Sequence, residues 1–268
     1  MALKISFIGG GAMGEAMLTS VINGKLSTAK DICVSDVKPE RRQYLAEKHR
    51  VAVTESNKAA VGKGDIIILA IKPQNLAEIM ADIKGHFKPD QLVISIIAGT
   101  RINTLRAGLD HKAVVRVMPN TPAQIGEGMS VWTATPEVTA AQKKQAADIL
   151  GAMGKQIFVD DEKYLDMATA VSGSGPAYFF FFVETLVEAA VQIGLSRDVA
   201  EQLAIQTFVG SAQLLKKSGK SPAELRKQVT SPGGTTAAAI TRFEQGGLSK
   251  LVLNAAVAAL NRAKELGK

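Results

Sequence analysis

Lys4-Ile-Ser-Phe-Ile-Gly-Gly-Gly-Ala-Met-Gly14 joins a short apolar run directly to a run of glycines near the start of the chain. Residues 4–8 have the composition of a buried strand, and the apolar residues between Ala12 and Val21 have the spacing of a helix. These signals predict a strand, a glycine turn and a helix that follow one another without a gap.

The glycines at positions 9, 11 and 14 fall on the G-x-G-x-x-G spacing of dinucleotide-binding turns. Gly9 permits a tight turn, Gly11 lets the backbone approach a pyrophosphate, and Gly14 lets the helix pack closely on the strand. The free N–H groups at the N-terminus of the helix favour an anion. We therefore predict a nucleotide site, with an ordinary βα turn as the alternative interpretation.

The composition is that of a soluble globular protein large enough for two domains. The chain has 268 residues, of which 46% are hydrophobic and 21% charged. Its net charge of +7 suits anionic ligands or a basic surface. Nucleic acid is the obvious alternative partner, but the basic residues are dispersed and aromatic residues make up only 5%. We therefore expect no nucleic-acid partner.

The apolar stretch Ala177–Leu195 is interrupted by Glu184 and Glu188, which favours a buried helix over a membrane span. No signal peptide is expected, because the first residues run straight into the predicted strand. Cys33, the single cysteine, lies within a predicted strand and is interpreted as a packed core thiol. A reducing, cytoplasmic location is expected. The histidines stand alone in polar surroundings, so no metal site is predicted: His49, His86 and His111.

The end of the second predicted strand, Asp31–Ser35, carries two conflicting signals about the nucleotide. Asp36 follows directly, and an acidic residue there typically binds the ribose 2′-hydroxyl of NAD. The basic residues that come next could instead bind the 2′-phosphate of NADP, or could be solvated charges on a helix after Pro39: Lys38, Arg41 and Arg42. The choice between the two cofactors stays open from these residues.

Further buried strands are predicted at Asp65–Ile71, Leu92–Ile97 and Val114–Val117. Each breaks into small or turn-forming residues at its carboxyl end, where ligands lie in doubly wound sheets. A helix near Thr139–Gly151 and a strand near Lys155–Val159 follow, and strand signals then disappear. We predict an α/β fold with an N-terminal Rossmann-type doubly wound sheet over residues 1–161 and an all-α C-terminal domain over residues 162–268.

Two segments of the helical half are expected to be loops with an additional role. Ser172-Gly-Ser-Gly-Pro176 and Ser231-Pro-Gly-Gly-Thr-Thr236 each precede a predicted helix. Both place hydroxyl groups and backbone N–H groups at a helix N-terminus, which suits a carboxylate. Ordinary helix capping is the alternative.

Taken from end to end, the chain resembles the pyrroline-5-carboxylate reductases. The last two of the matching stretches are specific to this family among dinucleotide enzymes. The stretches are Phe7-Ile-Gly-Gly-Gly-Ala-Met-Gly14, Ala70-Ile-Lys-Pro73, Ile97-Ala-Gly99, Met118-Pro-Asn-Thr-Pro122, Val171-Ser-Gly-Ser-Gly-Pro-Ala-Tyr178 and Ser231-Pro-Gly-Gly-Thr-Thr236. The resemblance implies reduction of 1-pyrroline-5-carboxylate to L-proline by hydride transfer from NADPH or NADH, the last step of proline synthesis.

The resemblance also implies which residues form the site. Asn57 matches a family position near the adenosine end, which inclines the cofactor slightly toward NADP, whereas Asp36 would repel a 2′-phosphate. The implied cofactor-binding residues are Gly9, Gly11, Ala12, Met13, Gly14, Ser35, Asp36, Asn57, Ala70, Lys72, Pro73, Ala98 and Gly99. The implied substrate-binding residues are Ser231, Gly233, Gly234, Thr235 and Thr236, of which Thr236 is also expected to be catalytic, by a hydrogen bond to the ring nitrogen.

Two other classes are weighed against this interpretation. β-Hydroxyacid dehydrogenases and imine reductases typically carry a lysine on the interdomain helix, but the helix from Ala177 to Ile193 has none. A non-catalytic NADP-binding regulator would not need two hydroxyl-rich segments. Long alanine-rich helices offer flat apolar faces that could pack between subunits. The resemblance further implies a homodimer, with a decamer of dimers as the larger assembly.

Overall fold

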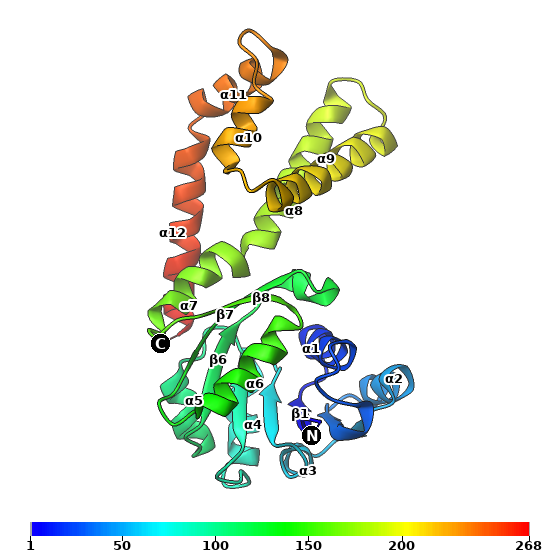
Figure 1. Cartoon of the computed structure of the whole chain (residues 1–268), viewed down its shortest axis with the longest axis vertical. Helices are drawn as coiled ribbons and strands as arrows, with labels where there is room; N and C mark the ends of the chain where they lie inside the picture. The colour runs from blue at the N-terminus through cyan, green and yellow to red at the C-terminus, as the bar shows by residue number, and fades with distance from the viewer. Residues whose placement is uncertain (1, 268) are drawn as a thin grey trace. The chain divides into compact units, whose positions relative to one another are not determined.

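The computed structural model describes residues 2–267 and contains one eight-stranded sheet with helices on both faces (Figure 1). The strand order is β3-β2-β1-β4-β5-β6-β7-β8. All neighbouring strands are parallel except β6 and β7, which are antiparallel. The first six strands in this order form a doubly wound sheet, so the predicted Rossmann-type fold is confirmed.

The elements alternate between strand and helix as far as β8, after which only helices follow. The strands are β1 (Ile5–Ile8), β2 (Ile32–Ser35), β3 (Ala52–Thr54), β4 (Ile66–Leu69), β5 (Leu92–Ser95), β6 (Val114–Met118), β7 (Gly128–Ala134) and β8 (Gly154–Phe158). The helices between them are α1 (Ala12–Asn23), α2 (Pro39–His49), α3 (Asn57–Val61), α4 (Leu76–Ile83), α5 (Ile102–Leu109) and α6 (Ala140–Gly151). The later helices are α7 (Lys163–Ala168), α8 (Gly175–Gln192), α9 (Arg197–Ser218), α10 (Pro222–Gln228), α11 (Thr235–Gln245) and α12 (Leu248–Leu266).

The central strands are buried on both faces because helices cover each side of the sheet. Alternate residues of one strand therefore enter different cores: Ile66 and Ile68 of β4 pack with α1, α2 and α6, whereas Ile67 packs with α3, α4 and α5. Cys33 lies in the second core, as expected of a structural thiol, and burial raises its pKa.

The antiparallel strand β7 was not predicted from the sequence. It starts at Gly128, and the polar residues Ser130 and Thr133 interrupt its apolar pattern although both are buried. Pairing with β6 and β8 satisfies its backbone on both edges. The side chain of Trp132 in this strand donates a hydrogen bond to Gln156 of β8.

Compactness divides the chain into two units that differ from the predicted domains. Unit 1 comprises Met1–Ser174 with Ala259–Lys268, and unit 2 comprises Gly175–Ala258. The expected boundary near residue 161 lies before α7. This helix groups with unit 1, where it packs against β6 and β7 and where Glu162 and Asp166 pair with Arg116 of β6. Such long-range ion pairs are not visible in a sequence pattern.

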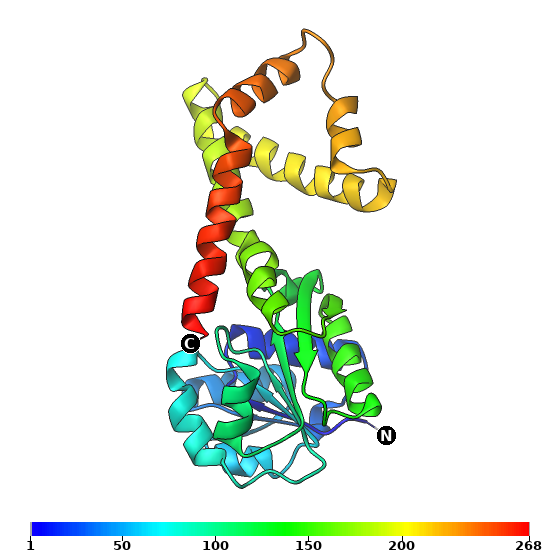
Figure 2. The ribbon, with the colours of Figure 1, turned by 90° about the vertical axis from the view of Figure 1, so that its left-hand side faces the viewer.

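Unit 2 is helical, and its core within the described chain is small. Helices α8 and α9 pack together around Val187, Ala200 and Ala204 (Figure 2). The expectation that the Phe-rich helix is buried is wrong for the single chain, since Phe180 is 61% and Phe181 70% exposed. By length and apolar composition alone, the described helical stretch Lys163–Gln192 could cross a membrane.

The expected loop at Ser172–Pro176 is also wrong. Residues Thr169–Gly173 form a π-helical turn that continues α7 almost directly into α8. The hydroxyl groups of Thr169 and Ser172 donate to the carbonyls of Leu165 and Ala168, one turn earlier. Such back-bonding lets serine and threonine stay within a helix, which explains why their presence did not mark a loop here.

We predict that Ser6→Ala stabilises the protein by about 0.5–1 kcal/mol. The Ser6 Oγ atom on β1 is fully buried and has no hydrogen-bond partner among the described residues, so its removal relieves an unsatisfied polar group. Denaturant unfolding at fixed protein concentration measures the change. Ser35→Ala is the matched control and should destabilise, because the Ser35 hydroxyl donates to Asn57 Oδ1 at 2.8 Å. A destabilised Ser6→Ala variant would contradict the prediction.

Candidate functional site

A cavity of about 630 Å³ lies at the carboxyl ends of β1, β2 and β4 in unit 1. The strand order reverses between β1 and β4, which is where open α/β sheets bind ligands. Seven of the predicted cofactor residues line it: Gly9, Gly11, Ser35, Asp36, Asn57, Ala70 and Lys72. Residues 12–14, Pro73, Ala98 and Gly99 do not line this cavity.

The glycine turn between β1 and α1 is held by contacts too close for any side chain. Gly9 has φ +98°, and a Cβ atom there would lie 2.6 Å from the Ala70 carbonyl oxygen. A Cβ atom on Gly14 would lie 2.6 Å from the Gly9 carbonyl oxygen. At Gly11, by contrast, a Cβ atom would meet nothing within 4 Å. The turn is thus tightly packed beneath and open at the N-terminus of α1, which fits an anionic group there.

Asp36, at the end of β2, is held in place by backbone groups. Its Oδ2 accepts a hydrogen bond from the Gly10 amide at 2.9 Å, and its Oδ1 accepts from the Lys38 amide at 3.0 Å. The carboxylate therefore connects the β2 end to the glycine turn. Each oxygen keeps a lone pair for a further donor, such as a ribose hydroxyl group.

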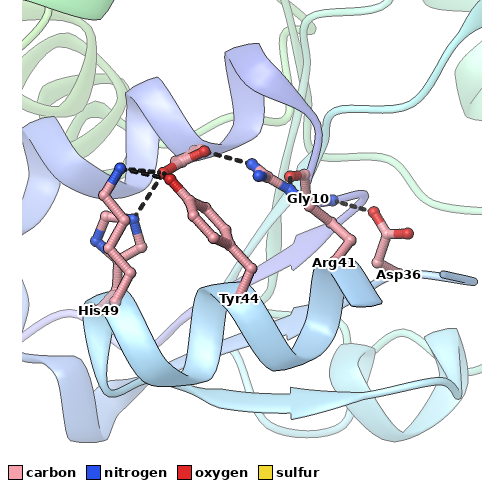
Figure 3. Close-up of polar contacts among 7 residues, drawn as sticks. Gly10, Asp36, Arg41, Tyr44 and His49 are labelled. Atoms are coloured by element: carbon pink, nitrogen blue, oxygen red, sulfur yellow. Dashed lines mark hydrogen bonds and ion pairs between the residues drawn. The ribbon is translucent and has the colours of Figure 1, made fainter. Parts of the chain in front are cut away.

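A second carboxylate, Glu15 of α1, gathers side chains from α2 (Figure 3). Arg41 pairs with Glu15 Oε2, and its Nε also donates to the Gly10 carbonyl. Lys48 and His49 contact Glu15 Oε1 at 3.0 Å, and Tyr44 donates to the same atom at 3.2 Å. We call Glu15 and the four side chains that contact it, Arg41, Tyr44, Lys48 and His49, the Glu15 network. It fixes Arg41 at the rim of the cavity, with the guanidinium 4.8 Å from the centre of the Tyr44 ring.

Burial alone would raise the pKa of the Glu15 carboxyl, but hydrogen bonds from His49, Arg41 and Lys48 outweigh it and lower the pKa to about 2. The carboxylate is therefore charged at neutral pH and able to orient Arg41. From the sequence, Arg41 is expected either to bind a 2′-phosphate or to be a solvated charge on the helix after Pro39, and no role is expected for Glu15 or Tyr44. The signal that was missed is the helical spacing of Arg41, Tyr44 and Lys48, which lie on one face of α2.

The predicted substrate residues lie in unit 2, at the start of α11. The Gly234 amide donates to the Ser231 carbonyl at 3.0 Å, and Gly233 has φ +71°, so this segment forms a tight turn. Gly234 caps α11 without a side-chain acceptor. The first amides of α11, from Thr235 and Thr236 onward, therefore point out of the helix end toward any anion placed there.

The histidines are more engaged than the sequence suggested. His49 belongs to the Glu15 network, and His111 is buried with a ring nitrogen 2.7 Å from the Gln91 carbonyl oxygen. Their surroundings are thus not simply polar and isolated. Within residues 2–267, no group of three or more His, Cys, Asp or Glu side chains is arranged to hold a metal ion.

Two family profiles match the chain in tandem. One, described as NADP oxidoreductase coenzyme F420-dependent, matches residues 4–99, and one, described as pyrroline-5-carboxylate reductase dimerisation, matches residues 162–266. A pyrroline-5-carboxylate reductase of Pseudomonas aeruginosa is 42% identical over 266 residues, which cover 99% of this chain and 97% of the relative. The chain belongs to the pyrroline-5-carboxylate reductase family. This confirms the resemblance inferred from the motifs.

Solved structures agree with this membership. A pyrroline-5-carboxylate reductase from Coxiella burnetii is 36% identical with a TM-score of 0.93, and the match covers 100% of both chains. A Plasmodium falciparum pyrroline carboxylate reductase with NADP bound is 32% identical with a TM-score of 0.88, covering 99% of this chain and 98% of that one. The chain is thus an oxidoreductase with a pyridine-nucleotide fold, and its matched dimerisation region supports homo-oligomerisation.

We predict that Glu15→Gln removes a pH-dependent part of the stability. The folded-state pKa near 2 lies below the ordinary value of 4.5, so the stabilisation is present above pH 4.5 and is lost as the pH falls toward 2. Its size is on the order of 2–3 kcal/mol at pH 7. Denaturant unfolding at pH 7, 5 and 3 should show the two proteins converging at acid pH. A constant difference at all three values would contradict the assignment.

Proposed function

We propose that this chain reduces 1-pyrroline-5-carboxylate to L-proline, with the nicotinamide cofactor in the cavity of unit 1 and the substrate carboxylate at the start of α11. Family membership supports the reaction, and the open N-terminus of α1 supports the cofactor position. When bound, the reduced nicotinamide supplies a hydride to the carbon of the C=N bond. The reaction completes proline biosynthesis.

The residues around the cavity fit a dinucleotide. The helix end beyond Gly11 has room for the diphosphate, and its backbone N–H groups favour the negative charge. Asp36 and Asn57 line the adenosine side, where the Ser35 hydroxyl donates to Asn57 and fixes its amide. We assign Ala98 and Gly99, which follow β5, to the nicotinamide side on the basis of the family resemblance.

Of the amides of residues 233–236 expected from the sequence to bind the substrate carboxylate, those of Gly233, Thr235 and Thr236 would donate to it, because the Gly234 amide already donates to the Ser231 carbonyl. Main-chain amides at a helix end are fixed donors, so they bind and orient a small anion without side-chain rearrangement. The Thr236 hydroxyl would contact the ring nitrogen and hold the C=N bond in the orientation needed for hydride transfer. The product nitrogen also needs a proton, which the substrate can carry as an iminium ion. Lys72 could donate this proton, but a role as a turn residue directly before η2 (Pro73–Asn75) explains its position more simply.

NADPH is proposed as the preferred cofactor, with NADH also accepted. Lys38 and Arg41 line the cavity beside Asp36, and both Asp36 oxygens already accept backbone amides. The positive charges of Lys38 and Arg41, together with the amides that bind Asp36, would offset the repulsion between the Asp36 carboxylate and a 2′-phosphate group. The NADP-bound Plasmodium relative supports the same choice.

The assembly and location are proposed from exposed and buried side chains of the two units. The exposed phenylalanines of α8 support a homodimer formed through unit 2, and dimers are proposed to associate further into a decamer of dimers. Sedimentation would detect both steps, and an active monomer would exclude the dimer requirement. The buried, unpaired Cys33 supports a cytoplasmic location, with neither a membrane nor nucleic acid as partner. Cell fractionation tests this.

We predict that Thr236→Ala lowers kcat for pyrroline-dependent NADPH oxidation by about 10- to 100-fold, the effect expected of one oriented hydrogen bond. The thermal transition should stay unchanged because Thr236 is not a core residue. Thr241→Ala on the same helix is the control, since its hydroxyl donates only to the Ala237 carbonyl. Unchanged turnover of Thr236→Ala would remove this residue from the proposed mechanism.

We predict that Arg41→Gln lowers kcat/KM for NADPH by about tenfold and changes the value for NADH much less, since a charged hydrogen bond to phosphate is lost. Arg42→Gln is the control, because Arg42 contacts the carbonyls of Asp36 and Val37 rather than lining the cavity. Initial rates with both cofactors provide the comparison. A wild-type protein that uses NADH more efficiently than NADPH would overturn the proposed preference.

A further inference from the structure

A cluster of charged side chains lies within unit 1, outside the cavity described above. Asp166 of α7 is 2% exposed and pairs with Arg101 at 2.9 Å and with Arg116 at 3.5 Å. Glu162 pairs with Arg116 at 2.6 Å. Two arginines and two carboxylates thus neutralise one another in a largely buried place, so the loss of one partner is felt by the others.

The charged cluster fixes the turn of the chain between β5 and α5. Arg101 precedes α5, and Glu162 Oε1 accepts a hydrogen bond from the Ile102 amide at 2.8 Å. A carboxylate directly before α7 therefore caps the N-terminus of α5, in place of the local side chain that usually does so. Arg101 and Ile102 directly follow Ala98, Gly99 and Thr100, the turn after β5, which we call the β5 turn. The β5 turn is anchored at its carboxyl end by two carboxylates, Glu162 just before α7 and Asp166 within it.

The same turn is covered by the end of the chain. Gly99 has φ +72°, and a Cβ atom there would lie 2.9 Å from Leu266 Cβ in the last turn of α12. A Cβ atom on Gly267 would lie 2.9 Å from Arg101 Nε. The last turn of α12 therefore packs on the β5 turn and on Arg101, beside α7 (Figure 1).

We propose that Arg101 is a positioning residue for the reaction: its ion pair with Asp166 fixes the β5 turn on the nicotinamide side of the cofactor site. This rests on the proposed function, which places Ala98 and Gly99 beside the nicotinamide. Hydride transfer depends steeply on the distance and angle between donor and acceptor atoms. A turn held by a buried ion pair, a helix cap and the α12 end keeps the nicotinamide face fixed, without contact between Arg101 and either reactant.

The test compares Arg101→Gln with Arg106→Gln. Both arginines are partly exposed and belong to the α5 region, and Arg106 pairs with Glu137 at 2.7 Å. For each variant we would measure kcat and KM for NADPH and pyrroline-5-carboxylate, the affinity for 2′,5′-ADP, and the thermal transition. The fragment 2′,5′-ADP contains the adenosine end of NADPH but no nicotinamide. It therefore reports the cofactor site without the β5 turn.

We expect Arg101→Gln to lower kcat by about fivefold or more with 2′,5′-ADP affinity unchanged, while Arg106→Gln keeps the wild-type kcat. Because Asp166 is buried, Arg101→Gln should also lower the thermal transition more than Arg106→Gln does, so kcat is measured well below that transition. Arg101→Lys should recover most of the lost kcat because it restores the charge facing Asp166. Should Arg101→Gln retain wild-type kcat, or lose kcat and 2′,5′-ADP affinity together, the positioning role is wrong. A wild-type protein without pyrroline-dependent NADPH oxidation would instead overturn the proposed function, which keeps the two failures distinct.

Discussion

The close approach of the glycine turn to β4 is the constraint on which the cofactor unit depends. A Cβ atom on Gly14 would clash with the Gly9 carbonyl oxygen, and a Cβ atom on Gly9 would clash with the Ala70 carbonyl oxygen. These contacts bring the end of β1, the start of α1 and the end of β4 within a few ångströms of one another. The cavity exists because the strand order reverses at this point and the chain leaves the sheet in opposite directions. A single added methyl group on either glycine would separate these elements.

Carboxylates fix the orientation of two arginine side chains in unit 1. Glu15 orients Arg41 at one end of unit 1, and Asp166 orients Arg101 after β5. In both places an acidic residue of one helix fixes an arginine in or before another, and backbone groups take part through Gly10 and Ile102. Fixed charges of this kind are arranged during folding, so the site needs little rearrangement when ligands bind.

Much of the fold and part of the site could be predicted from the sequence, because they depend on local patterns. Continuous apolar runs such as residues 65–71 indicate strands buried on both faces, and the glycine spacing locates the cofactor turn. Strand β7 was not predicted because Ser130 and Thr133 interrupt its apolar pattern, although both residues are buried in a strand that pairs on both sides. The segment at 172–176 was misread as a loop because its serines bond back within a helix. The Glu15 network and the α7 ion pairs join residues distant in sequence, so no spacing rule could reveal them.

The exposed phenylalanines of α8 affect how a newly synthesised chain folds and assembles. Among the described residues of unit 2, the buried core consists of Val187, Ala200 and Ala204, so in the proposed dimer this unit would gain much of its burial by association. The stability of unit 2 would therefore rise with subunit concentration, and dilution would destabilise unit 2 before the sheet of unit 1. If the proposed dimer forms through α8, a newly synthesised chain exposes these phenylalanines until it meets a second copy. During that interval aggregation competes with productive pairing.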